Sequence, residues 1–416
     1  MLLVAAALAN GLTTHVTISE YALQHLGDDA LASIVRDPDL WLQLQNGTQF
    51  PDGGYPLGHA YAETAHWEPF QDRYLAWIAS TYAGDFSSLE ARQHVAFLMG
   101  LSSHGMADQV FDSLYMQRAY VYDVDSDWQD TSMDTATDVA IAERTGGQDT
   151  VDAWADWDTM VLLMGEAGVE VDVDTLQQGQ ALTQVAISFG RTAGSIPEQA
   201  ELYREQYPWA YEHILDESIH GSPPWEAKVV AEYWKVRWAR LNGQQADNEP
   251  VIYTFPRDGD YGHPVDASTV ESRLTIVTSR AVVADLVVPD FFTVTDAEGN
   301  DYHVDPWVFY GTGSHTIHLV PGADWPGDTD FDVTVHAGIP FIDGTDSTRD
   351  VTFAFSTRAP PAEGEPPVYE DTCGCSAPAT APGAAPGAAP GAAPGAAFAA
   401  LAALAALRRS RPPRAP

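Results

Sequence analysis

The chain has 416 residues and a formal net charge of −39, from 20 Lys and Arg against 59 Asp and Glu. This charge argues against nucleic acid as a partner, because so acidic a surface repels the phosphate backbones that supply most non-specific affinity. It also disfavours adsorption to anionic lipid faces, and it suits solubility and the capture of cations. The length exceeds one ordinary domain and 45% of the residues are hydrophobic, so we expect two folded domains and tails.

The N-terminus resembles the end of an export signal. Residues 2–9 form a short apolar run that closes with Ala7-Leu8-Ala9, an A-x-A pattern that signal peptidase accepts. The run lacks a positively charged start, and a buried first strand or helix is the alternative interpretation. We expect residues 1–9 to be a signal-peptide remnant and the protein to be exported.

Residues 10–247 are predicted to form a mostly α-helical domain. Apolar residues recur at helical spacing over 23–35 and again over 95–102. Further along, Pro197 is placed for a helix start, and Gly243 stands just past a helix end. Short apolar runs do not alternate with helices here, so a parallel sheet is not expected.

Residues 248–358 change in character and predict a β-sandwich. Glu298-Gly299-Asn300 and Pro326-Gly327-Asp328 are turn signals between short β-branched runs. About seven short strands over about 100 residues fit an immunoglobulin-like fold. The stretch resembles the bacterial Ig-like modules that follow catalytic domains in surface proteins. The runs are 274–277, 281–288, 291–294, 316–320, 332–336 and 351–355.

The C-terminal end has the composition of a disordered, disposable tail. Residues 359–395 form a Pro/Gly/Ala-rich linker that contains Cys373 and Cys375, and residues 396–416 hold a short apolar helix followed by arginines. This order resembles the C-terminal sorting tags of myxobacterial exported proteins. The resemblance implies recognition by a sorting and processing machinery, and a protein that is secreted or held at the cell surface or outer membrane. A low-complexity tail without a role is the alternative.

Five residues before position 110 are candidate metal ligands: His15, Asp52, His66, His104 and Asp108. His104 and Asp108 stand four apart in a helical stretch, so both project from one face and could grip one ion. The alternative is an ordinary hydrogen-bonded pair on a helix surface. Asp52 lies in a predicted turn, where Asp before Gly is also common turn chemistry. His66 alone could equally be a capping or packed histidine.

The order of four segments adds to these single observations. They are residues 11–16 around His15, residues 50–52, residues 65–70 and residues 95–108. In this order and spacing they resemble the zinc-dependent phospholipase C superfamily, and most closely the catalytic domain found in the glycosylphosphatidylinositol-specific phospholipase D family. The resemblance spans about residues 11–145 and implies an all-helical domain with up to three zinc ions in a cleft.

The resemblance also implies roles for the five candidates. Asp52, His66 and His104 would ligate one zinc ion, and Asp108 would bridge it to a second one held by His15 and the mature N-terminal backbone. Asp52 and Asp108 would be catalytic, since Asp52 is also placed to orient or deprotonate water. A mixed His and Asp donor set suits zinc, and the carboxylates offset the charge of the dication.

The third zinc site of the family is where this sequence departs. Asp112 stands where the family has a histidine, and Asp134 and Asp138 replace the later His-x-x-x-Asp/Glu pair. An all-oxygen site of this kind would suit Mg²⁺ or Ca²⁺. The alternative is a decayed site that has become solvated acidic surface.

We therefore expect an exported, zinc-dependent phosphodiesterase that hydrolyses phospholipid or glycosylphosphatidylinositol-type phosphodiester bonds through a zinc-activated water. Tyr55 and Trp67 are expected to line the approach for a lipid or glycan, with core packing as the alternative. A catalytically degraded surface binding or adhesion protein is the second hypothesis, and bound metal would separate the two. Related single-strand nucleases share the helical architecture, but the acidic charge argues against them.

Overall fold

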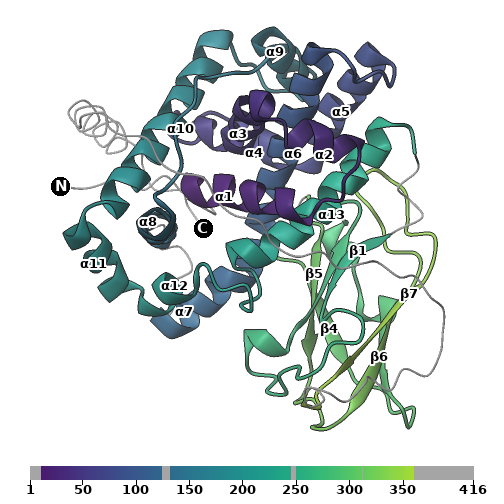
Figure 1. The fold of residues 1–416 in the computed structure, drawn as a ribbon. Helices are drawn as coiled ribbons and strands as arrows, with labels where there is room; N and C mark the ends of the chain where they lie inside the picture. Colours follow the sequence, from purple (N-terminus) through teal and green to yellow (C-terminus); the bar gives the residue numbers. More distant parts are fainter. Residues whose placement is uncertain (1–10, 124–131, 245–249, 312, 360–416) are drawn as a thin grey trace, which may run out of the picture.

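The computed structural model describes residues 11–123, 132–244, 250–311 and 313–359. Helices form the first part of the chain and strands the second, which confirms the predicted order (Figure 1). None of the helices in these ranges is both long and apolar enough to cross a membrane. The signal-peptide remnant, the linker, both cysteines and the sorting tail lie outside the described residues and stay predictions.

The helical part runs from Leu12 to Leu241. Proline begins α11, as Pro197 predicted, and α13 ends two residues before Gly243. Helix α6 continues through a π-helical turn, Phe111–Met116, into α7. The helices are α1 (Leu12–Ala22), α2 (Ala30–Val35), α3 (Trp41–Gln49), α4 (Tyr61–His66), α5 (Glu68–Tyr82), α6 (Leu89–Val110), α7 (Gln117–Asp123), α8 (Ser132–Thr145), α9 (Trp157–Glu166), α10 (Val173–Gly194), α11 (Pro197–Gln206), α12 (Pro208–His213) and α13 (Pro223–Leu241).

Helix α6 is the centre of the helical part and is buried over most of its length. It packs closely against α3, because Gly47 in α3 and Gly100 in α6 bring the two backbones together. A Cβ atom on Gly47 would lie 2.1 Å from the carbonyl oxygen of Phe97, and one on Gly100 would lie 2.1 Å from that of Leu44. A methyl group fits at neither position, so these glycines set the distance between α3 and α6.

The second part holds seven strands among the described residues, in two antiparallel sheets. One sheet has the order β1-β2-β5-β4 and the other β3-β6-β7. Buried side chains from both sheets, such as Ile276 and Val333, belong to one hydrophobic cluster. The immunoglobulin-like type stays a prediction. The strands are β1 (Val251–Phe255), β2 (Leu274–Thr278), β3 (Phe292–Asp296), β4 (Val304–Trp307), β5 (Thr316–Pro321), β6 (Asp330–Val335) and β7 (Val351–Ser356).

One predicted strand, 281–288, is wrong. Only Val282 forms a bridge there, to Phe341, and residues Ala284–Leu286 form a 3-10 turn. Leu286 is exposed, so the apolar residues of this run do not share one buried face. An apolar run alone does not form a strand, because a strand also needs a neighbouring strand to pair with.

The helical part and the strands pack on each other through a buried ionic cluster at Glu68. Its carboxylate accepts a hydrogen bond from the backbone N–H of Ala281 at 2.6 Å and lies 2.6 Å from the guanidinium of Arg240. The apolar core of the helical part also includes Tyr253 and Val277 from β1 and β2. The two parts therefore share a continuous apolar interior.

The buried His318 in β5 predicts that the strand region loses stability in acid. Burial, with a smaller contribution from Arg273, lowers the pKa of His318 from 6.5 to about 3. The folded protein thus keeps this ring neutral, while the unfolded chain takes up a proton below pH 6.5. The contribution of His318 to the free energy of unfolding is therefore fully present above pH 6.5, and it is lost as the pH falls towards 3.

We expect the substitution His318→Gln to flatten the pH dependence of the free energy of unfolding between pH 6.5 and 4, by up to about 1.4 kcal/mol per pH unit. Denaturant titrations at several pH values measure this slope. The exposed His303, replaced by Gln, is the matched control and should leave the slope unchanged. Equal slopes for the His318→Gln variant and the unmodified protein would contradict the prediction.

Candidate metal centre

The structure brings all five predicted ligands together from four separate elements. His15 comes from α1, Asp52 from the 3-10 turn Pro51–Gly54, His66 from the end of α4, and His104 and Asp108 from one face of α6. Every one of them is at most 4% exposed. Residues up to 93 positions apart in the sequence thus meet in one buried polar cluster.

The ligand atoms lie at the distances that a shared ion requires. His66 Nε2 lies 3.5 Å from Asp52 Oδ1 and 3.4 Å from Asp108 Oδ2. His104 Nε2 lies 3.6 Å from each of the same two oxygens, and His15 Nε2 lies 3.1 Å from Asp108 Oδ1. For comparison, tetrahedral ligands at zinc bond lengths of about 2.0–2.1 Å are separated by about 3.3 Å.

The protonation of two histidines follows from their backbone contacts. His66 Nδ1 lies 2.6 Å from the carbonyl oxygen of Ala62, and His104 Nδ1 lies 2.7 Å from that of Thr48. A carbonyl oxygen can only accept, so each Nδ1 carries a proton and donates it. In a neutral ring Nε2 then bears a lone pair, which is how metal-binding histidines are oriented in other proteins.

The Nε2 atoms of these two rings face each other. His66 Nε2 and His104 Nε2 are 2.9 Å apart, and the ring of His15 stacks on that of His104 with centroids 3.8 Å apart. Two neutral rings in this arrangement repel each other unless a proton or a cation lies beside both nitrogens. Two groups, His15/Asp52/His104 and His66/His104/Asp108, have ligand atoms within 4.8 Å of one another and could each hold an ion.

The electrostatics of the cluster are those of an anionic cation-binding site. Burial raises the pKa of Asp52, but His104 and the neighbouring histidines outweigh that effect and hold it below its ordinary value. Burial lowers the pKa of His66, yet Asp52 and Asp108 bring it up to about 9. The site therefore keeps its carboxylates charged and favours positive charge beside them.

Asp138, one of the three residues proposed for a third metal site, lies at the N-terminus of α1. Its carboxylate accepts hydrogen bonds from the backbone N–H groups of Thr13 at 3.1 Å and Thr14 at 2.8 Å, and from the Thr14 hydroxyl at 2.9 Å. It thus satisfies the first free N–H groups of α1, at the helix end that carries a partial positive charge. That helix carries His15, so Asp138 of α8 positions a candidate ligand.

The other two residues of the proposed third site are also held inside the protein. Asp112 accepts a hydrogen bond from the hydroxyl group of Tyr310, and Asp134 is 4% exposed with an unpartnered Oδ1. The interpretation as solvated acidic surface is wrong for Asp134 and Asp138, because both are buried against neighbouring helices. In the described ranges neither close ligand group includes Asp112, Asp134 or Asp138, and the third metal site stays a prediction.

Sequence reasoning missed Glu226, in the first turn of α13. Its side chain is fully buried, and neither carboxylate oxygen has a hydrogen-bond partner among the described residues. Burial, with Asp108 and Asp112 nearby, raises its pKa well above the ordinary value. An acid two residues after the prolines of Pro223-Pro224 is typical of a helix start, so the sequence offered no sign that it faces the interior.

Two aromatic residues border the cluster where it approaches the surface. The ring of Tyr55 lies 5.2 Å and that of Trp67 6.1 Å from the ring of His66. Both are half-buried, and both donate hydrogen bonds to the exposed Glu63, at 3.1 and 2.8 Å. Both lie beside the candidate centre, and neither belongs to the apolar core of the helical part, which was the alternative interpretation of these two residues.

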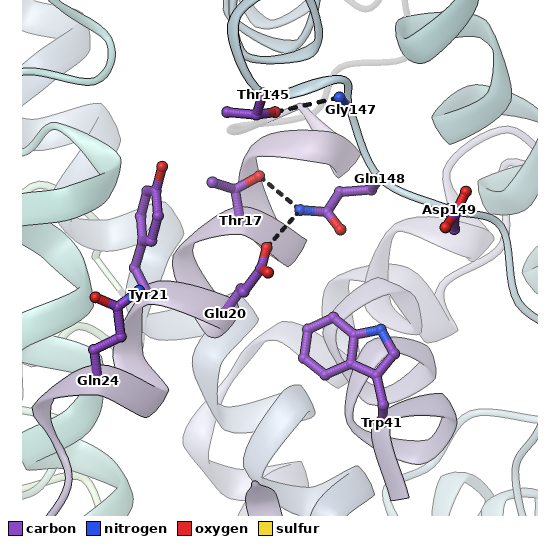
Figure 2. Close-up of a pocket in the computed structure, with 9 residues that line it drawn as sticks. All are labelled: Thr17, Glu20, Tyr21, Gln24, Trp41, Thr145, Gly147, Gln148 and Asp149. Atoms are coloured by element: carbon purple, nitrogen blue, oxygen red, sulfur yellow. Dashed lines mark hydrogen bonds between the residues drawn. The ribbon is translucent and has the colours of Figure 1, made fainter. Parts of the chain in front are cut away.

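A separate polar pocket lies on the opposite face of α1 from His15. Figure 2 shows its lining, in which Gln148 donates hydrogen bonds to Thr17 and Glu20, and Trp41 lies at one side. Its volume is about 430 Å³. It contains none of the five candidate ligands, so it is distinct from the metal centre.

Comparisons with known proteins find partial sequence similarity. No family model matches the chain. The chain is 32% identical over 121 residues to phosphatidylinositol-glycan-specific phospholipase D of Rattus norvegicus, 30% over 122 residues to that of Bos taurus, and 31% over 121 residues to that of Homo sapiens. Each match covers 27% of this chain and only 14% of the relative.

Comparison with solved structures gives no further information on the fold or function of the chain. Two structures of the bacterial surface-layer protein SbsC align over 79% of this chain and 46% of their own, at 10% and 11% identity and TM-scores of 0.21 and 0.22. Such scores are too low to inform fold or function. The chain is thus distantly similar to phosphatidylinositol-glycan-specific phospholipase D over about a quarter of its length.

Proposed function

We propose that the protein is a metal-dependent phosphodiesterase that hydrolyses phospholipid or glycosylphosphatidylinositol-type phosphodiester bonds. The observation that carries the proposal is the pair of buried histidines, His66 and His104, whose Nδ1 protons are held by backbone carbonyls and whose Nε2 atoms meet between two carboxylates. The similarity to phosphatidylinositol-glycan-specific phospholipase D supports the choice of substrate class.

The donor set fits zinc, and two ions fit it better than one. Asp108 turns Oδ1 towards His15 and Oδ2 towards His66 and His104, so one carboxylate faces two sets of ligands. Bound zinc would supply Lewis acidity and lower the pKa of a coordinated water towards neutrality. An acidic protein can bind an anionic phosphate in this way, because bound cations would be the largest charges near the site.

The residues of the chain then have separable roles. Asp52 directs Oδ1 at His66 and His104, while Oδ2 has no hydrogen-bond partner within the described residues and is placed to take a proton from the attacking water. His15 and His104 fix each other by ring stacking. All five residues are buried, and Tyr55 and Trp67 are half-buried beside His66, so we propose that a substrate group enters past these two rings.

We also propose that the protein is exported and displayed at the cell surface or secreted. The support is the apolar run closed by Ala7-Leu8-Ala9 and the tail that resembles a sorting tag. The C-terminal processing machinery would be a partner.

Purified full-length protein tests the proposed activity. We expect two zinc ions per chain after dialysis against zinc, and hydrolysis of phosphatidylinositol vesicles that stops on treatment with a chelator and returns with zinc. A protein that binds zinc but cleaves neither these vesicles nor bis(p-nitrophenyl) phosphate would overturn the proposed enzyme. Protein that binds no metal would favour the second hypothesis, a degraded surface binding or adhesion protein.

A further inference from the structure

The connection between β4 and β5 is attached to the helix that carries two candidate metal ligands. Gln109 follows Asp108 directly, and its side-chain oxygen accepts a hydrogen bond from the backbone N–H of His315 at 2.6 Å. One turn further on, Asp112 accepts a hydrogen bond from the hydroxyl of Tyr310. Figure 1 shows β4 and β5 in the sheet that lies next to α13. The strand region is therefore part of the surroundings of the metal centre.

The same connection also packs against Trp67, the neighbour of His66. The rings of Tyr310 and Trp67 are 5.0 Å apart. Gly313 has a φ of 78°, and a Cβ atom on it would lie 3.1 Å from the side chain of Trp67, so the backbone itself reaches the indole. Such close approach is what a glycine at this position permits.

From Trp67 a line of aromatic rings leads away from the metal centre. Tyr310 is followed by Phe309, with centroids 4.8 Å apart, and Phe309 by Trp307, with centroids 5.4 Å apart. We name Trp67, Tyr310, Phe309 and Trp307 the aromatic strip. All four side chains are half-buried, so each keeps part of its surface open to solvent. Three of the four come from the strand region.

Most of the polar atoms along the strip are already used. The indole N–H of Trp67 donates to Glu63, and the Tyr310 hydroxyl donates to Asp112. Phe309 has no polar atom. Arg273 lies over the ring of Trp307, 5.1 Å from its centroid, so the apolar ring surface of the strip is that of Trp67, Tyr310 and Phe309. Such a surface suits a hydrocarbon chain better than a sugar.

We propose that the aromatic strip binds the apolar chain of an amphiphilic phosphodiester whose phosphate lies at the metal centre. The proposal rests on the proposed function and assigns to that site the residues that recognise the aliphatic tail of its lipid substrate. It follows from continuity, because the strip begins at the residue next to His66 and continues through ring contacts into the strand region. The strand region is then a specificity element and not a spacer.

Two soluble substrates with the same headgroup test this with the zinc-loaded full chain. They are glycerophosphocholine, which has no tail, and dihexanoylphosphatidylcholine below its micelle concentration. We expect Tyr310→Ala and Phe309→Ala to lower kcat/KM for the tailed substrate by about tenfold, mainly through KM, and to leave the tailless substrate unaffected. Phosphorus NMR follows either product. Tyr261→Ala, an exposed tyrosine elsewhere in the strand region, is the control and should change neither rate.

Equal losses on both substrates, or no loss on the tailed one, would overturn the proposal. The variant Tyr310→Phe keeps the ring and removes its hydroxyl, so it should retain the preference for the tailed substrate. Loss of that preference in Tyr310→Phe would assign the effect to the hydrogen bond with Asp112, and would also contradict the strip. Zinc content and circular dichroism identify any variant that has not folded, and Phe309→Ala then provides the second test.

A binding measurement separates failure of the strip from failure of the proposed function. If the unmodified protein cleaves neither phosphocholine substrate, phosphatidylinositol vesicles and bis(p-nitrophenyl) phosphate decide whether the phosphodiesterase proposal fails. Calorimetry with monomeric dodecylphosphocholine and with phosphocholine tests the strip in either case. If the strip binds the alkyl chain, dodecylphosphocholine should bind at least about tenfold more tightly than phosphocholine, and Tyr310→Ala should remove this difference. Equal affinities for the two probes would contradict it.

Discussion

The substitution His104→Gln is expected to remove both bound metal and hydrolysis, while His94→Gln in the same helix leaves both in place. His104 is fully buried, and its Nε2 faces His66, Asp52 and Asp108. Glutamine cannot supply an imidazole nitrogen to an ion there. Loss of outer partners of metal ligands commonly costs 10–100-fold, so we expect loss of a ligand itself to lower activity by more than about 100-fold.

His94 is a close control because it is also a buried histidine of α6. It is 2% exposed, its Nδ1 lies 2.7 Å from the Tyr74 hydroxyl, and its ring packs near Trp77 and Trp154. Elemental analysis gives the metal content, and hydrolysis of phosphatidylinositol vesicles gives the activity. Retention of two metal ions by the His104→Gln variant would show that the cluster is not the metal site. Equal losses in both variants would show that helix packing explains the effect.

The substitution Asp138→Ala is expected to destabilise the protein even when no metal is bound. The carboxylate accepts two backbone N–H groups and one hydroxyl at the buried start of α1. Removing it leaves those N–H groups without a partner at about 1–3 kcal/mol each, and removes a negative charge from a helix N-terminus. We expect the free energy of unfolding to fall by about 2–4 kcal/mol, measured by guanidinium titration of chelator-treated protein.

The metal-free condition separates two roles of Asp138. If it were only a ligand of a third ion, its removal would leave the metal-free protein as stable as before and change metal content alone. Asp138→Asn keeps one acceptor and should have a smaller effect. Asp134→Asn, on the same helix α8, is the control, because Asp134 Oδ1 has no partner to lose. A metal-free Asp138→Ala variant with unchanged stability would contradict the capping role.

The sequence predicts those parts of this structure that depend on short spacing. The helical periodicity of residues 95–102 lies in α6, and the four-residue step from His104 to Asp108 does place both side chains on one face. The strands at 274–277 and 351–355 follow in the same way from local apolar patterns. In each case one element contains the whole signal.

The features that were missed depend on residues far apart in the chain. The resemblance places Asp138 in a third metal site, whereas its hydrogen bonds with the N–H groups of Thr13 and Thr14, more than 120 positions away, leave no trace in a local pattern. Tyr310 donates a hydrogen bond to Asp112 across 198 positions, and no local pattern marks Tyr310 as the partner of that aspartate. Only the packing of the whole chain decides whether such a carboxylate caps a helix, accepts a phenol or faces an ion.

The close contact between α3 and α6 has a consequence for the order in which the centre assembles. The glycines at this contact bring the Thr48 carbonyl to the His104 ring, so that ring is oriented only once the two helices have docked. An unfolded or half-docked chain presents scattered donors and binds an ion weakly, whereas the docked pair presents them together. Uptake of metal would then come late in folding, and an ion with high affinity for the finished centre would stabilise the folded state against unfolding.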